Sequence, residues 1–161
     1  MITRGNNTRR GERRVREQPA HVLLIEDDDV LRQMLADELR EAGYEVTERN
    51  RVFAWFQFCV RKASPPSPEW KNEHYDAVVS DVRMPDVSMD GLEALRILRE
   101  IGAAEASPPV IFTTGCCDDH LYSSARELGA AAVLEKPFEI DQLLSELDMA
   151  MQAPRERTHA G

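Results

Sequence analysis

Polar side chains capable of joint chemistry stand at the ends of four short apolar runs in this sequence. They are Glu26 and Asp27 after 21–25, Asp81 after 77–80, Thr114 at the end of 110–114, and Lys136 shortly after 131–134. A buried strand needs its apolar run, but it does not need a charge at its end. Because the carboxyl ends of parallel strands meet at one edge of a sheet, these side chains are expected to share one site.

Three carboxylates, one ammonium group and one hydroxyl suit a phosphoryl group bound beside a metal ion. The carboxylates of Glu26, Asp27 and Asp81 would repel one another unless a cation lay among them. A set of oxygen ligands without His or Cys favours Mg²⁺. Lys136 supplies a positive charge and Thr114 a hydroxyl for the oxygens of phosphate. One carboxylate could then attack phosphorus and hold it as an acyl phosphate.

Each of these residues also has an ordinary structural explanation. A lone acid such as Asp81 is most often a solvated loop residue or a helix cap. Lys136 alone would be interpreted as a surface amine, and Thr114 as a β-branched residue suited to a strand. Their joint occurrence at consecutive strand ends favours chemistry over these explanations.

The spacing of apolar residues predicts five strands that alternate with five helices. The expected strands cover 21–25, 44–48, 77–79, 110–114 and 131–134, and the expected helices cover 31–42, 52–62, 91–101, 118–128 and 140–151. Gly43 and Gly129 are expected to end the first and fourth helices. The alternation predicts an α/β fold of the flavodoxin-like type, with a doubly wound five-stranded parallel sheet and helices on both faces.

Composition predicts one domain with two polar ends. A chain of 161 residues, 42% hydrophobic and 30% charged, can bury a core of its own. No apolar run reaches the roughly 20 residues of a membrane helix, and the Arg-rich start lacks the apolar segment of a signal peptide, so a cytoplasmic protein is expected. The domain is predicted to span 21–152, between a disordered arm at 1–20 and a polar tail at 153–161.

Charge is distributed unevenly along the chain. Residues 1–20 hold six Arg and two Glu, so they carry about +4 within a chain whose net charge is −9. The acidic remainder argues against broad nucleic-acid binding by the folded part, whereas the arm could touch an acidic surface or be functionally silent. The cysteines at 59, 116 and 117 lack metal-ligand spacing and are expected to be free thiols.

The predicted helix at 52–62 is unusually aromatic. Its aromatic residues are Phe53, Trp55, Phe56 and Phe58. One helix buries only one stripe of side chains, so part of this set should remain exposed or meet a partner. Coverage by neighbouring loops is the equally open alternative.

The site residues lie within motifs that resemble the receiver domain of two-component response regulators. The resemblance runs from about 21 to 152 and rests on the segments 24–28 (LIEDD), 80–85 (SDVRMP), 90–91 (DG), 110–115 (VIFTTG) and 135–138 (EKPF). Each segment is short, but their order and their placement at strand ends make the set specific.

The resemblance implies a role for each side chain of the expected site. The implied roles are Asp81 as phosphoacceptor, Glu26 and Asp27 as the acidic pair that holds Mg²⁺, the backbone carbonyl of Arg83 as a further metal ligand, and Thr114 and Lys136 as the groups that bind the phosphoryl oxygens. The peptide bond between Lys136 and Pro137 is implied to be cis, as it usually is in this family.

Three features depart from the family pattern. Five residues separate Pro85 from Gly91 where receivers usually have three, and the loop at 63–74 is longer than usual. Val133 occupies the position where receivers generally carry a Tyr or Phe that reports phosphorylation. Its short β-branched side chain is expected to pack as a permanent core residue, so the change on phosphorylation would pass through the loop that begins at Gly115.

These observations together predict a stand-alone response regulator that takes a phosphoryl group on Asp81 from a histidine kinase or histidine phosphotransfer protein. Its output would be a protein–protein contact or phosphate shuttling, with no DNA-binding domain, no membrane contact, and homodimerisation left open. The alternative is a Mg²⁺-dependent phosphatase with an aspartyl nucleophile, although Arg83 stands where such enzymes need a second acid. A binding scaffold without phosphorylation is disfavoured because each expected site residue is present, and a dinucleotide site lacks its glycine pattern after 21–25.

Overall fold

The computed structural model describes residues 17–64, 73–83, 89–116 and 118–153. The predictions for most of the arm, for the tail, and for the greater part of the two longer loops therefore lie outside the described residues. None of the helices in the described part is long and apolar enough to cross a membrane.

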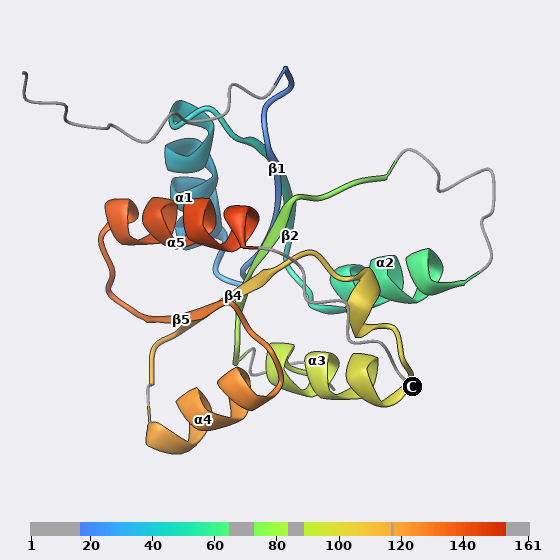
Figure 1. Cartoon of the computed structure of the whole chain (residues 1–161). Coiled ribbons are helices and arrows are strands. Elements are labelled where there is room, and N and C mark those ends of the chain that lie inside the picture. The colour runs from blue at the N-terminus through green and yellow to red at the C-terminus, as the bar shows by residue number, and fades with distance from the viewer. Residues whose placement is uncertain (1–16, 65–72, 84–88, 117, 154–161) are drawn as a thin grey trace, which may run out of the picture.

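Five strands alternate with five α-helices in the described part of the chain, as predicted (Figure 1). The strands are β1 (His21–Ile25), β2 (Glu45–Arg49), β3 (Ala77–Asp81), β4 (Val110–Thr114) and β5 (Ala132–Glu135), and the α-helices are α1 (Asp29–Glu41), α2 (Phe53–Ala63), α3 (Gly91–Glu100), α4 (Asp119–Glu127) and α5 (Ile140–Gln152). The boundaries lie within two residues of the predicted ones. The short 3-10 helix Ala104–Ala106 is an addition that the apolar spacing does not predict.

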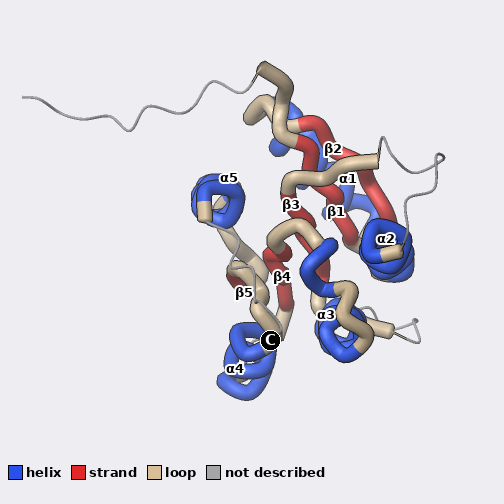
Figure 2. Tube along the Cα trace, turned by 45° about the vertical axis from the view of Figure 1, so that its right-hand side comes forward, coloured by secondary structure: helices blue, strands red, loops and turns tan. Residues whose placement is uncertain are grey.

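The strands form one parallel sheet in the order β2-β1-β3-β4-β5. This is the flavodoxin-like order, in which the chain reverses its direction of winding between β1 and β3. Residues of α1 and α5 pack against one face of the sheet and residues of α2, α3 and α4 against the other. Figure 2 shows α5 across the sheet from α2 and α3. The predicted fold class is confirmed, and the carboxyl ends of β1 and β3 lie side by side at the point where such folds bind ligands.

Both faces of the sheet carry an apolar core, because successive strand residues point to opposite sides. In β1, Leu23 and Ile25 join the cluster beneath α2, α3 and α4, while Val22 and Leu24 join the cluster beneath α1 and α5. All four are at most 1% exposed. This burial on two sides explains why the run at 21–25 is apolar throughout rather than alternating.

Acids and glycines define the helix ends. Asp28, Asp90 and Asp118 cap α1, α3 and α4, and each accepts a hydrogen bond from the backbone N–H three residues onward. Gly43 and Gly129 follow α1 and α4 with φ of 95° and 89°, a conformation that other residues rarely adopt. The predicted helix stops at these two glycines are therefore confirmed.

Helix α2 buries one aromatic stripe and leaves another side chain in solvent. Trp55 and Phe58 are at most 4% exposed, and the Trp55 Nε1–H donates to Ser107 Oγ at 2.9 Å. Burial raises the pKa of the neighbouring Cys59 thiol to about 12. Phe53 remains 54% exposed, which confirms that part of the aromatic set is not covered by the described residues.

Val133 corrects one expectation. It is only partly buried, packed against the cluster beneath α2, α3 and α4, while its neighbour Leu134 is the buried residue of β5. The two residues point to opposite faces of this edge strand: Leu134 joins the cluster beneath α1 and α5, whereas Val133 lies at the margin of the cluster on the other face. Val133 is therefore a half-buried residue rather than a full member of the core.

Candidate functional site

Asp81 ends β3 as a nearly buried acid with two hydrogen-bonded oxygens. Its side chain is 10% exposed. The Lys136 ammonium group donates to Asp81 Oδ2 at 2.9 Å, and the backbone N–H of Arg83 donates to Oδ1 at 3.1 Å. A buried carboxylate needs such partners to offset the loss of water.

Two further acids from the end of β1 complete a cluster with Asp81. Carboxylate oxygens of Glu26, Asp27 and Asp81 lie within 4.8 Å of one another. Glu26 is buried, and its two oxygens accept from Lys136 Nζ at 2.8 Å and from the Asp28 backbone N–H at 3.2 Å. Asp27 is exposed, so the cluster opens to solvent on that side.

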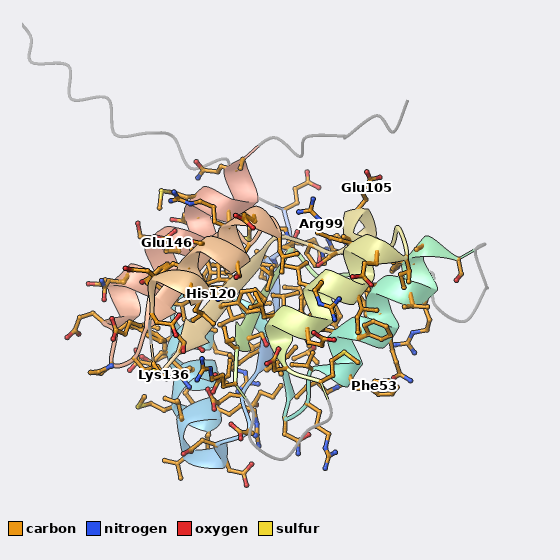
Figure 3. The ribbon with its side chains drawn as sticks, turned by 90° about the horizontal axis from the view of Figure 1, so that it is seen from below. Phe53, Arg99, Glu105, His120, Lys136 and Glu146 are labelled. Carbon is orange, nitrogen blue, oxygen red and sulfur yellow. The ribbon has the colours of Figure 1, made fainter. Side chains whose placement is uncertain are left out.

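The charges of this cluster do not balance within the described residues. Three carboxylates face one ammonium group, that of Lys136, which Figure 3 places at the strand-end side of the molecule. Hard oxygen donors that converge with an unpaired negative charge fit a divalent cation of the Mg²⁺ type. The donor set thus fits the predicted metal.

The pKa values of Glu26 and Lys136 are both raised, but the causes differ. Desolvation raises the pKa of Glu26, against the opposing effect of Lys136, because the charged carboxylate loses water. Desolvation acts to lower the pKa of Lys136, but hydrogen bonds to Asp81 and Glu26 outweigh it and raise the pKa. The Lys136 ammonium group therefore remains charged beside the two carboxylates that it contacts.

Thr114 ends β4, the strand beside Asp81, and its hydroxyl is engaged with its own loop. Asp81 pairs with Thr113 in the register of β3 and β4, so Thr114 lies one residue beyond it at the same edge. The Thr114 hydroxyl donates to the carbonyl oxygen of Cys116 at 2.9 Å and accepts from the Cys116 backbone N–H at 3.2 Å. The Lys136 backbone N–H donates to the Thr114 carbonyl at 2.7 Å, which ties the ends of β4 and β5 together.

Gly91 supports the site through close packing. A Cβ atom at this position would lie 2.8 Å from Phe112 Cε1 and 3.2 Å from the Asp81 carbonyl oxygen. Its backbone N–H also donates to the Val82 carbonyl at 3.1 Å. Any larger residue would push α3 away from the segment that carries Asp81.

Arg32 is a residue of the site that the sequence reasoning missed. Its Nη1 donates to the backbone carbonyl of Glu26 at 2.7 Å, and its Nε lies 3.8 Å from Glu48 on β2. Only 17% of its side chain is exposed. The guanidinium group therefore fixes the loop that presents Glu26 and Asp27, and only its position one turn into α1 could have indicated this.

The structure brings the predicted side chains of Glu26, Asp27, Asp81 and Lys136 into one cluster, with Thr114 at the adjoining strand end. Arg83 contributes a backbone N–H to Asp81, while the metal-binding role of its carbonyl stays a prediction. The predicted cis peptide bond before Pro137 is present.

Comparison with known proteins agrees with this geometry. Residues 22–148 match the family described as the response regulator receiver domain. The chain belongs to this family. It is therefore a receiver domain of the kind found in response regulators of two-component signalling.

The receiver is similar to regulators of several bacteria. It is 33% identical over 132 residues to the transcriptional regulatory protein FixJ of Bradyrhizobium diazoefficiens, covering 82% of this chain and 57% of that protein. It is 35% identical over 140 residues to the transcriptional regulatory protein PdtaR of Mycobacterium tuberculosis, covering 87% of this chain and 60% of that protein. The chain thus spans less than two thirds of these relatives.

Solved receiver structures show the same architecture. The crystal structure of FixJ-N superposes with a TM-score of 0.65 at 28% identity, covering 85% of this chain and 97% of that one. The chemotaxis response regulator CheY4 of Vibrio cholerae gives a TM-score of 0.61 at 27% identity, covering 83% of this chain and 99% of that one.

Proposed function

We propose that Asp81 accepts a phosphoryl group from a phosphohistidine of a partner histidine kinase or phosphotransfer protein, in a Mg²⁺-dependent reaction. One observation carries this proposal. The nearly buried Asp81 carboxylate is bonded to Lys136 and also grouped with two further carboxylates, which leaves a negative surplus that a bound cation would offset before a phosphoryl group could approach.

The acids of the cluster would hold the metal. Glu26, Asp27 and Asp81 would supply side-chain oxygens, and Arg83 its backbone carbonyl. When bound, Mg²⁺ supplies positive charge that offsets the repulsion between the carboxylates and the oxygens of phosphate. The loop after β1 would hold Glu26 and Asp27 in place before the ion binds. Binding would then require less rearrangement of these two side chains.

Transfer to Asp81 would be a nucleophilic displacement at phosphorus. One carboxylate oxygen forms the new P–O bond while the P–N bond to the donor imidazole breaks, and the electron pair of that bond stays with the imidazole. Lys136, which already contacts Asp81 at 2.9 Å, is placed to pair with a phosphoryl oxygen. No oxidant or reductant takes part.

The readout of this step would begin at Thr114. Its hydroxyl donates to the Cys116 carbonyl at 2.9 Å, so it can donate to a phosphoryl oxygen only by giving up this bond. Val133 cannot add the ring movement of an aromatic residue. Signalling through protein contacts or phosphate shuttling would therefore depend on the loop that follows β4.

A labelling experiment tests the proposal. The protein is incubated with acetyl phosphate and Mg²⁺, with a matched reaction in excess EDTA, and the acid-stable, base-labile phosphate is mapped by mass spectrometry. We expect one labelled peptide that contains Asp81, and we expect the label to be lost in EDTA. Labelling elsewhere, or equal labelling in EDTA, would contradict the proposal.

A further inference from the structure

The carboxyl-terminal ends of helices α1 and α5 meet at a surface that carries acids. Glu38 and Glu41 lie in the last turn of α1, which contacts α5. On α5, Asp148 accepts a hydrogen bond at 3.2 Å from the hydroxyl of Tyr44, which stands just beyond α1. Helix α5 contains two further acids and no basic residue. We call Glu38, Glu41 and Asp148 the acidic edge.

The two arginines of α1 do not neutralise this edge. Arg32 and Arg40 both approach Glu48 on β2, at 3.8 and 2.9 Å, so they occupy the flank of α1 that faces β2. A turn of about 100° per residue puts Glu38 on the far side of the helix from Arg40. Glu38 and Glu41 are exposed, and their carboxylates form no hydrogen bond or ion pair with another described residue.

The position of these acids is unfavourable for the helices themselves. The last turn of an α-helix carries a partial negative charge, so it stabilises cations and repels acids. Glu38 and Glu41 stand in such a turn, and the last turn of α5, next to Asp148, holds no basic residue. The described residues therefore leave a place where added positive charge would be stabilising.

The N-terminal arm joins the folded part beside the acidic edge. The Ala20 carbonyl accepts from the Glu45 backbone N–H at 2.9 Å, and Glu45 directly follows Tyr44. Figure 1 shows the first described residues, in blue, at the same end of the molecule as the turn between α1 and β2. The 16 residues before the described part can extend over about 50 Å, whereas α1 is about 20 Å long.

The arm supplies the charge that the acidic edge lacks. Residues 9–16, next to the described part, hold five Arg and one Glu. A guanidinium group can bond to both oxygens of a carboxylate, and its aliphatic stem can cover apolar surface. Met34, 54% exposed and one turn before Glu38, offers such a surface.

We propose that residues 9–16 dock on the acidic edge of the same molecule. The guanidinium groups would pair with Glu38, Glu41 and Asp148, and so place cations at the ends of α1 and α5. The covalent link favours the arm over a separate basic partner, because it keeps the arm at a high effective concentration. The proposal concerns a surface outside the Asp81 cluster and does not depend on phosphorylation.

Tryptic cleavage of the full-length protein tests the docking, since trypsin cuts after Arg. The rate of cleavage within residues 9–16 is followed by mass spectrometry at low and at high salt. At low salt we expect the arm of Glu38→Lys/Glu41→Lys to be cut about fivefold faster than that of the wild-type protein, as expected when a few exposed ion pairs are lost. High salt should remove this difference by screening.

Two further variants make the test specific. Glu127→Lys is the matched control, because Glu127 is also an exposed acid at the last position of a helix, α4, against the other face of the sheet. It should leave the cleavage rate of the arm unchanged. Glu38→Gln/Glu41→Gln adds no basic group and should raise the rate about twofold, which provides a second measurement if the Lys variant fails to fold.

Amide signals locate the arm on the surface. Arg13→Gln/Arg14→Gln should shift the signals of 37–44 and 146–153 and leave those of α4 in place. Equal cleavage rates in wild-type protein and both Glu38/Glu41 variants would overturn the proposal, as would shifts confined to other elements. Protection that disappears on dilution would also overturn it, because the arm would then bind a second copy.

Discussion

The two ends of β3 both collect polar side chains, but they balance charge differently. At the amino end, Asp76 accepts from the His21 backbone N–H at 2.8 Å and lies 3.2 Å from the ring of His74. The His21 ring contacts Thr47 at 2.7 Å. At the carboxyl end, three carboxylates lie within 4.8 Å of one another, and Lys136 bonds to two of them, Glu26 and Asp81.

The polar groups at the amino end of β3 have a structural explanation, whereas those at the carboxyl end point to a function. One carboxylate bonded to nearby donors is how proteins ordinarily satisfy a polar group. Buried carboxylates in excess of their cations cost stability, and replacement by neutral residues would remove that cost. The carboxyl end of β3 therefore holds a charge arrangement that folding alone does not account for.

The largest effect on stability is expected from Lys136→Met. Removing the shared cation leaves carboxylates facing one another, and the free energy of unfolding should fall by about 3 kcal/mol in metal-free buffer. Asp76→Ala, at the amino end, loses ordinary hydrogen bonds and should cost only about 1 kcal/mol. Urea denaturation in EDTA measures both values. A larger loss for Asp76→Ala would reverse the comparison.

Metal should stabilise one end of β3 and leave the other unaffected. At a hundredfold excess over its dissociation constant, Mg²⁺ should add about 2.7 kcal/mol to the stability of the wild-type protein. Asp27→Asn should lose most of this gain and be no less stable without metal, because it removes one of the crowded charges. Thermal melts with Mg²⁺ and with EDTA report both, and an undiminished Mg²⁺ effect in Asp27→Asn would remove Asp27 from the site.

Arg32 should affect metal binding only indirectly, by holding the loop that carries Glu26 and Asp27. Arg32→Gln removes the 2.7 Å bond to the Glu26 carbonyl and should lower Mg²⁺ affinity about tenfold, the usual effect of an outer contact. Arg40→Gln is the matched control, since Arg40 also pairs with Glu48, at 2.9 Å, but forms no hydrogen bond or ion pair with Glu26 within the described part of the chain. Titration calorimetry compares them, and equal affinities would show that Arg32 only stabilises the fold.

The smallest effect concerns the response of the loop after β4. A phosphoryl mimic such as beryllofluoride should shift the amide signals of 115–122 strongly and those around Val133 weakly, because Thr114 must leave its bonds to Cys116. Thr114→Val should suppress these shifts, whereas Thr113→Val, at an equally buried neighbour, should preserve them. Stronger shifts at Val133 would show that β5 carries the change.

Most of the fold could be predicted from local patterns. Apolar runs such as 21–25 define strands buried on both faces, and Gly43 and Gly129 mark helix ends because their φ values are positive. The 3-10 helix Ala104–Ala106 carries no apolar period of its own. The partial burial of Val133 depends on strand order, which the sequence pattern does not state.

The site residues that could be predicted are those whose charged side chains directly follow an apolar strand. Glu26, Asp81 and Lys136 could be grouped because each follows an apolar run, and the structure places them within hydrogen-bonding distance. Arg32 could not be found in this way, since it acts through a backbone carbonyl and sits on an ordinary helix. The close approach of Gly91 to Phe112 likewise exists only in three dimensions.

Phosphate labelling of variants at the two ends of β3 tests the central claim most directly. Asp81→Asn and Asp76→Asn are nearly isosteric changes on either side of one strand, and both are treated with acetyl phosphate and Mg²⁺ beside the wild-type protein. We predict complete loss of the label in Asp81→Asn and wild-type labelling in Asp76→Asn, with both variants folded by circular dichroism. Undiminished labelling of folded Asp81→Asn would contradict the account.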